Sequence, residues 1–162
     1  LDEIIGKNFK LRNIEFFLKL KKTEMASPFN QDNLYWNLQQ SKGINVWIAL
    51  NESNNKNGGV TYLKGSHKNR IYNHEISKTK GTSQTIPQKT LKNFKFKSTT
   101  PSLKKGDCIV HNFKVIHGSK KNNSKNDRIG LAISFQNKYE KINKVKMKLY
   151  KEKLKRNLKF IN

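Results

Sequence analysis

Apolar side chains gather in short stretches that polar segments separate. The strongest stretch covers residues 44–50, where β-branched and aromatic side chains follow a glycine and precede an asparagine-rich loop. Further apolar stretches cover residues 13–20, 60–63, 108–110, 115–117 and 129–135. We predict a strand at each of these places. The loop at 51–59 ends in Asn-Gly-Gly, which favours a hairpin between its flanking strands.

The pattern is weak and polar between residues 64 and 101. Only Phe94 and Phe96 alternate there as a half-buried strand does. We therefore expect a long loop with short strands in this part of the chain. Many short strands with Gly and Asn turns favour a β-sandwich or barrel.

The C-terminal segment at 139–160 has a different period. Apolar residues recur there at spacings of three and four, with lysines at most other positions, which predicts an amphipathic helix. These apolar residues are Met147, Tyr150, Leu154, Leu158 and Ile161. We expect this stripe to pack on the barrel rather than on a partner or a membrane surface. The chain thus divides into a β-barrel domain at 1–138 and a lysine-rich helix at 139–162.

The length of 162 residues suits one domain, and the charge is strongly basic, at 34 − 11 = +23. Such a charge is typical of nucleic-acid binding, since a basic face releases counterions from phosphate. However, arginine supplies only 4 of the 34 basic residues, and base recognition depends on arginine forks. We expect a solvated lysine surface and no nucleic-acid partner.

No stretch approaches the roughly 18 apolar residues of a membrane span, and no signal peptide opens the chain. The single Cys108 has no partner for an internal disulfide, which is typical of a reducing compartment. We therefore expect a cytoplasmic location and no membrane contact. Because Leu1 is not an initiator methionine, we also expect the chain to lack an N-terminal part of its domain.

Asp32 is the first candidate for chemistry, since it lies in an aromatic-rich segment at 28–36 without lysine. In an extended segment, residues 30 and 32 share a face. That spacing is what a two-ligand metal clip at a strand end requires. A third ligand would come from elsewhere, and either His117 or His111 could supply it.

Five segments together resemble the phytanoyl-CoA dioxygenase family of Fe(II)/2-oxoglutarate oxygenases. In order, they cover residues 29–36, 46–50, 57–59, 65–68 and 106–128. The first reads Phe-Asn-Gln-Asp-Asn-Leu-Tyr-Trp, and the last holds His-Gly-Ser at 117–119, Asn-Ser at 123–124 and Arg128. The combination is specific, although each segment alone is not.

The resemblance implies a mainly β fold, a double-stranded β-helix or jelly-roll barrel of the cupin type, followed by the C-terminal helix. It also implies an iron held by two histidines and one carboxylate. Asp32 would be the carboxylate ligand and His117 the distal imidazole. Asn30 stands where the family has its first histidine, so it would be an atypical third ligand.

The same resemblance assigns the cosubstrate pocket. Arg128 would grip the C5 carboxylate of 2-oxoglutarate with its planar fork, and Ser119 would add a hydrogen bond. Trp47 would line the pocket. His111, six residues before the distal histidine, is expected to make structural hydrogen bonds in the barrel.

The sequence therefore favours a non-haem dioxygenase, a hydroxylase using Fe(II), 2-oxoglutarate and dioxygen on a small-molecule substrate that no residue identifies. Asn30 favours a rival interpretation, a catalytically silent barrel that binds a ligand or partner without turnover. A lysine-driven nucleic-acid binder is the third alternative.

Overall fold

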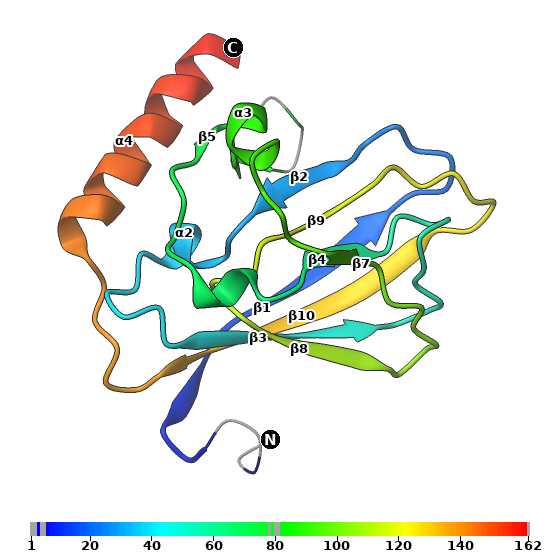
Figure 1. Cartoon of the computed structure of the whole chain (residues 1–162), viewed down its shortest axis with the longest axis horizontal. Helices are drawn as coiled ribbons and strands as arrows, with labels where there is room; N and C mark the ends of the chain where they lie inside the picture. Colours follow the sequence, from blue (N-terminus) through cyan, green and yellow to red (C-terminus); the bar gives the residue numbers. More distant parts are fainter. Residues whose placement is uncertain (1–2, 4–5, 78, 80–81, 162) are drawn as a thin grey trace.

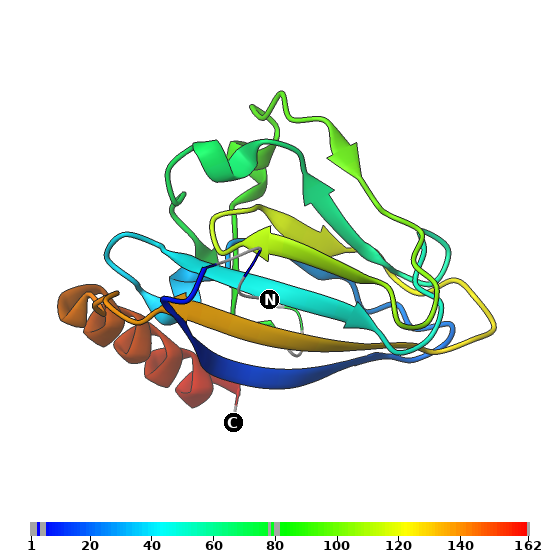
Figure 2. The ribbon, with the colours of Figure 1, turned by 90° about the horizontal axis from the view of Figure 1, so that it is seen from below.

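The structure is a computed structural model that describes residues 3, 6–77, 79 and 82–161. Two four-stranded antiparallel sheets lie one above the other (Figures 1 and 2). The first has the order β1 (Phe9–Lys19), β10 (Arg128–Asn137), β3 (Gly43–Ala49) and β8 (Cys108–Asn112). The second has the order β2 (Ser27–Asn30), β9 (His117–Ser119), β4 (Val60–Leu63) and β7 (Ser98–Thr99). The expected fold class, a mainly β double-stranded β-helix with a C-terminal helix, is confirmed.

Short elements connect these strands. They are α2 (Asn33–Trp36), the 3-10 helix η1 (Ser66–Lys68), β5 (Glu75–Ile76), β6 (Gln84–Thr85) and α3 (Gln88–Leu91). The strand β2 was missed by the sequence prediction, which placed no strand between residues 20 and 44. Because β2 has four residues and contains Pro28, it offers no apolar run to recognise.

The expected strand around Phe94 and Phe96 is wrong. Both residues lie in an irregular segment between α3 and β7. Their ring centroids are 5.4 Å apart, and the ring of Tyr72 lies tilted against that of Phe94 with 4.7 Å between the centroids. They alternate because they cover a core cluster formed by Leu63, Ile86 and Ile116, not because they pair with a strand.

The predicted C-terminal helix is present as α4 (Lys144–Ile161) and contacts α2 and β5 (Figure 1). Tyr150 provides the clearest contact, with its ring edge-on to Tyr35 at 6.2 Å and its hydroxyl 3.2 Å from Ser83 Oγ. Leu158 and Ile161 of the expected stripe lie outside the side chains that the structure describes. Within the described residues, no helix is both long and apolar enough to span a bilayer.

The first sheet carries its polar residues on the inside. Along β10, burial alternates strictly, and the buried positions include Arg128, Gly130, Ala132 and Ser134. The apolar residues Ile129, Leu131, Ile133 and Phe135 occupy the other, half-buried face. Since directly paired residues of antiparallel strands share a face, the register extends this division across the sheet.

The inner face of this sheet therefore collects polar and aromatic side chains from four strands. Lys19 pairs with Arg128, Ala132 pairs with Trp47, and Asn45 pairs with His111. Small residues of β10 leave space for the large ones of β3, since a Cβ on Gly130 would collide with the Trp47 ring. This inner face supplies most of the candidate site.

Candidate metal centre and cosubstrate pocket

Asp32 lies in the turn that follows β2. The strand ends at Asn30, and Asp32 already has helical backbone angles, φ −57° and ψ −35°, at the start of α2. The extended segment expected to join residues 30 and 32 is therefore absent. Between them Gln31 is fully buried, and its backbone N–H donates to His74 Nε2 at 3.1 Å. This contact fixes the chain next to the carboxylate.

His117 opens β9 and directs one ring nitrogen at Asp32. Its Nδ1 lies 3.1 Å from the Val115 carbonyl oxygen, which can only accept a hydrogen bond. This contact matches the tautomer that donates from Nδ1, in which Nε2, 3.5 Å from Asp32 Oδ1, is left to bind a metal. A histidine oriented in this way by a backbone carbonyl is typical of metal ligands.

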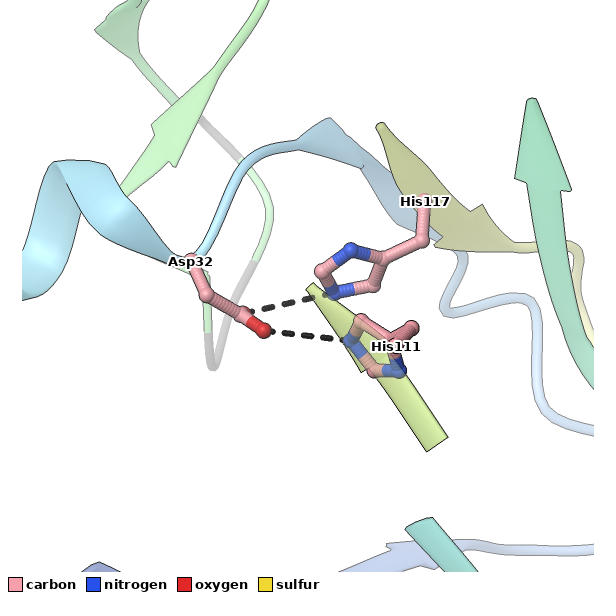
Figure 3. Close-up of side chains that lie close together, drawn as sticks. All are labelled: Asp32, His111 and His117. Carbon is pink, nitrogen blue, oxygen red and sulfur yellow. Dashed lines mark hydrogen bonds and ion pairs between the residues drawn. The ribbon is translucent and has the colours of Figure 1, made fainter. Parts of the chain in front are cut away.

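His111 approaches the same carboxylate from the opposite sheet (Figure 3). It lies on β8, and its Nε2 is 3.2 Å from Asp32 Oδ2. Asn45, the partner of His111 across the strand pair, donates to the same oxygen at 3.4 Å. The carboxylate is thus surrounded by two imidazoles and an amide.

These neighbours decide the charge of the cluster. Burial acts to raise the pKa of Asp32, but His117, His111 and Asn45 outweigh it and hold the pKa below its usual value. Burial lowers the pKa of His111, although its hydrogen bond to Asp32 opposes this effect. Divalent metals are bound by ionised carboxylates and neutral imidazoles, and the lowered pKa values of Asp32 and His111 favour these two forms.

One ligand atom from each of Asp32, His111 and His117 lies within 4.8 Å of the others. Two imidazole nitrogens and one carboxylate oxygen are the donor set that suits non-haem Fe(II). The residues present therefore fit this ion.

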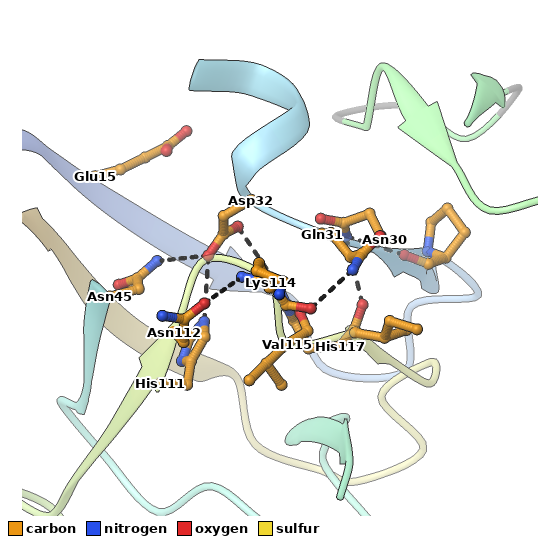
Figure 4. A network of polar contacts seen from close by, with 12 residues as sticks. Glu15, Asn30, Gln31, Asp32, Asn45, His111, Asn112, Lys114, Val115 and His117 are labelled. Carbon is orange, nitrogen blue, oxygen red and sulfur yellow. Dashed lines mark hydrogen bonds and ion pairs between the residues drawn. The ribbon is translucent and has the colours of Figure 1, made fainter. Parts of the chain in front are cut away.

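The structure also brings Asn30 next to His117, since the two are paired between β2 and β9. The Asn30 side chain is buried, and its Nδ2 lies 3.2 Å from the Pro28 carbonyl oxygen and 3.5 Å from that of His117 (Figure 4). Its amide nitrogen is thus directed at backbone carbonyls of β2 and β9.

Arg128 is a buried cation with only 4 % of its surface exposed. Its Nε has no hydrogen-bond partner, and no carboxylate of the described residues forms an ion pair with it. Trp47 covers the guanidinium, whose Cζ is 5.5 Å from the ring centroid. Burial lowers the pKa of Arg128 to about 10, because little around it compensates the charge.

A second buried cation, Lys19, lies beside Arg128. Its Nζ donates to Ser119 Oγ and to the Lys120 carbonyl oxygen, both at 2.6 Å. Burial and, to a smaller extent, the charge of Arg128 together lower the pKa of Lys19 to about 8. Two buried cations with one neutral hydroxyl form a cationic cluster that an anion would stabilise.

Tyr62 connects the two groups of residues. It lies on β4 opposite His117, with its ring centroid 5.2 Å from that of His111 and 6.1 Å from that of His117. Burial raises the pKa of its hydroxyl, Asp32 raises it further, and Arg128 opposes this effect. The hydroxyl is buried without a partner. The metal-ligand cluster and the cationic cluster therefore face one shared interior.

Sequence reasoning brought together Asp32, His117, Arg128, Ser119 and Trp47, and the structure gathers all five in this interior. It named His111 as an alternative to His117 for the third ligand, then gave it a structural role once the family resemblance assigned His117, and it missed Lys19 and Tyr62. The signal for Lys19 is its β1 position directly opposite Arg128. A surface hollow lined by Lys56, Lys120 and Ser124, among others, includes none of the site side chains.

Comparison with known proteins supports the same family. The phytanoyl-CoA dioxygenase profile matches residues 6–130. A relative from Stutzerimonas stutzeri, the "Probable alpha-ketoglutarate-dependent hypophosphite dioxygenase", is 25 % identical over 139 residues, which are 83 % of this chain and 48 % of the relative. The chain thus spans about half the length of the curated relative that it matches.

Solved structures share the fold. The non-haem monooxygenase ThoJ superposes with a TM-score of 0.72 at 20 % identity, over 87 % of this chain and 51 % of ThoJ. The epimerase SnoN, in complex with Fe3+, alpha-ketoglutarate and nogalamycin RO, gives a TM-score of 0.69 at 18 % identity, over 84 % and 53 % of the two chains. The two-sheet barrel described above is therefore the fold of non-haem oxygenases.

Proposed function

Because the chain belongs to the phytanoyl-CoA dioxygenase family, we propose that it is an Fe(II)- and 2-oxoglutarate-dependent oxygenase domain that hydroxylates a small molecule. Arg128 carries this proposal. A guanidinium that is 4 % exposed, with no carboxylate partner among the described residues, is costly unless an anion enters beside it. It faces the same interior as a carboxylate and two imidazoles, so the dianionic oxo acid that this family uses is the matching ligand.

Each residue then has a defined task. Asp32 and His117 hold the metal, and Asn30 occupies the place of the family's remaining ligand. Arg128 receives the distal carboxylate of 2-oxoglutarate in a bidentate contact, while Ser119 offers a hydroxyl that Lys19 already orients at 2.6 Å. Trp47 covers the guanidinium and excludes water from it.

When bound, Fe(II) and 2-oxoglutarate would together supply the oxidising chemistry, in which dioxygen, the oxo acid and a substrate C–H group are converted into carbon dioxide, succinate and the hydroxylated substrate. The chain binds and orients the cosubstrate through its buried cations. It also keeps this interior dry, which strengthens every charge-assisted contact made there.

The test replaces Arg128 by lysine and measures 2-oxoglutarate affinity calorimetrically in the presence of Mn(II). Lysine keeps the charge but not the fork, so we expect the dissociation constant to rise about tenfold or more, the worth of one charge-assisted hydrogen bond. Arg70→Lys is the matched control, because Arg70 is exposed and stacks on Tyr72. An unchanged constant in Arg128→Lys would contradict the assigned role.

Succinate formation from 2-oxoglutarate in air, with Fe(II) present, tests turnover itself. We expect the native chain to produce succinate and the Asp32→Asn variant to lose this activity. Tight binding of both metal and 2-oxoglutarate without any succinate would instead favour the silent-barrel alternative.

A further inference from the structure

We propose that His111, and not Asn30, supplies the third protein ligand of the iron, so that the metal centre of this chain is Asp32, His111 and His117. The inference rests on the proposed function, since it assumes that the chain binds the metal. In the family arrangement this ligand would come from position 30 on β2, whereas here it comes from β8 on the opposite sheet.

The first argument is convergence. The Nε2 atoms of His111 and His117 approach the two oxygens of one carboxylate, at 3.2 Å and 3.5 Å (Figure 3). Ligands about 2.1 Å from one ion in cis positions stand about 3.0 Å apart. The three side chains are thus already close to the spacing that a shared ion requires, and they project from two facing sheets and the turn after β2.

The second argument is the contrast with a structural histidine of the same chain. His74 is also buried, and both of its ring nitrogens have backbone partners, Gln31 N–H at Nε2 and the Tyr72 carbonyl at Nδ1. His111 is equally buried, but its Nδ1 has no partner and its Nε2 points at the carboxylate that His117 also faces. A side chain that only supported the barrel would be satisfied as His74 is.

The third argument concerns Asn30. Its Nδ2 is directed at the Pro28 and His117 carbonyl oxygens, which holds the side chain along the β2–β9 pair. An amide oxygen suits hard ions such as Ca²⁺ and Mg²⁺, whereas imidazole suits iron. With His111 in place, the chain keeps a two-histidine, one-carboxylate donor set although residue 30 is not histidine.

The experiment compares metal binding by His111→Gln, Asn30→Ala and the native chain. Affinity is measured by anaerobic titration with Fe(II), and imidazole ligands are counted by spin-echo EPR of the Cu(II)-substituted protein. We expect two imidazoles in the native chain and one in His111→Gln. Fe(II) affinity should fall at least tenfold in His111→Gln, since even groups that only support a ligand are worth about 10- to 100-fold, and change less than twofold in Asn30→Ala.

His67→Gln is the matched control, because His67 is exposed in η1 and should leave the imidazole count and the affinity unchanged. Circular dichroism of each apoprotein verifies that it is folded. If His111→Gln fails to fold, His111→Asn replaces it. Adding Asn30→His to His111→Gln should restore the second imidazole and most of the affinity.

Four outcomes would overturn the inference. A native chain with a single imidazole ligand would exclude His111, as would a loss of affinity in Asn30→Ala but not in His111→Gln. If the native chain binds no Fe(II) while Asn30→His does, His111 is not a ligand, although a site with histidine at position 30 still binds the metal. If neither binds Fe(II), the proposed function fails together with the inference.

Discussion

Tyr62 is a buried phenol that lies between two groups of opposite charge. Its hydroxyl has no partner among the described residues, and both Asp32 and Arg128 influence its pKa. A buried hydroxyl without a partner costs about 1–3 kcal/mol. This cost is explained if the hydroxyl becomes paired only when 2-oxoglutarate spans the interior from the metal ligands to the guanidinium.

Replacing Tyr62 by phenylalanine should therefore have opposite effects on the two states. The ligand-free protein should be equally stable or more stable in urea, because an unpaired polar group is removed. The dissociation constant of 2-oxoglutarate should rise several-fold, by the worth of one neutral hydrogen bond, about 0.5–1.5 kcal/mol. Tyr139→Phe is the control, because Tyr139 is 71 % exposed. Equal losses of stability and affinity would assign Tyr62 to packing alone.

His74 makes the stability of the chain depend on pH. Burial lowers its pKa to about 4, well below the ordinary value of 6.5. Between these values the unfolded chain binds a proton that the folded chain does not, so the free energy of unfolding falls as the pH falls from 6.5 to 4. Above pH 6.5 the group has no such effect.

Urea denaturation between pH 4.5 and 7.5 checks this expectation. The native chain should lose up to about 1.4 kcal/mol per pH unit through His74, and His74→Gln should lose correspondingly less. Because His67 is exposed, His67→Gln should keep the native slope. Parallel slopes for His74→Gln and the native chain would show that the His74 ring is protonated as readily in the folded as in the unfolded state.

At the scale of elements, the sequence predicts strands where apolar residues follow one another, as in β3 and β10, and fails where pairing alone makes the strand, as in β2. The sequence also does not show which face of a strand points to the interior. The apolar residues of β10, such as Leu131 and Ile133, face outwards, whereas Arg128 and Gly130 face the interior. No local pattern reveals this, because which face is buried depends on the second sheet.

The candidate site, like the strands, was predictable only in part from the sequence. Asp32 and His117 were identified from the family motifs, and the structure places them 3.5 Å apart. His111 has no such local signal, because its position depends on the register that sets it opposite Asn45. The turn into α2 orients the Asp32 side chain. The extended spacing of residues 30 and 32, on which the metal clip was predicted, does not.

The packing of β10 on β3 leads to a prediction for Gly130. A Cβ there would collide with Cζ2 and Cε2 of Trp47, so Gly130→Ala should destabilise the chain by about 1–3 kcal/mol in urea denaturation. It should also weaken 2-oxoglutarate binding, because Trp47 covers Arg128. Trp47→Phe removes the colliding atoms, so the double variant should recover part of the loss of stability. If the stability losses of the two single variants simply add up in the double variant, the collision is refuted.

At the scale of the whole molecule, a strongly basic chain presents an apolar sheet face. The outward residues of β1 are exposed, with Ile14 at 54 %, Phe16 at 71 % and Leu18 at 60 %. They pair directly with Ile133, Leu131 and Ile129 of β10, so the six form one continuous patch. Exposed apolar patches promote association, whereas a net charge of +23 keeps chains apart.

Salt should change the balance between these two forces. The distance over which charges act falls from about 30 Å at 0.01 M salt to about 8 Å at 0.15 M, so repulsion between chains weakens while the apolar attraction remains. We expect sedimentation velocity to show self-association that rises between these two salt concentrations. Phe16→Lys should suppress this self-association, because the substitution interrupts the patch at its most exposed residue.

Lys10→Glu is the control, since Lys10 is an exposed β1 residue outside the six and the change lowers the net charge without interrupting the patch. Association that falls with salt, or that Phe16→Lys leaves unchanged, would show that contacts between charges and not this face hold the chains together.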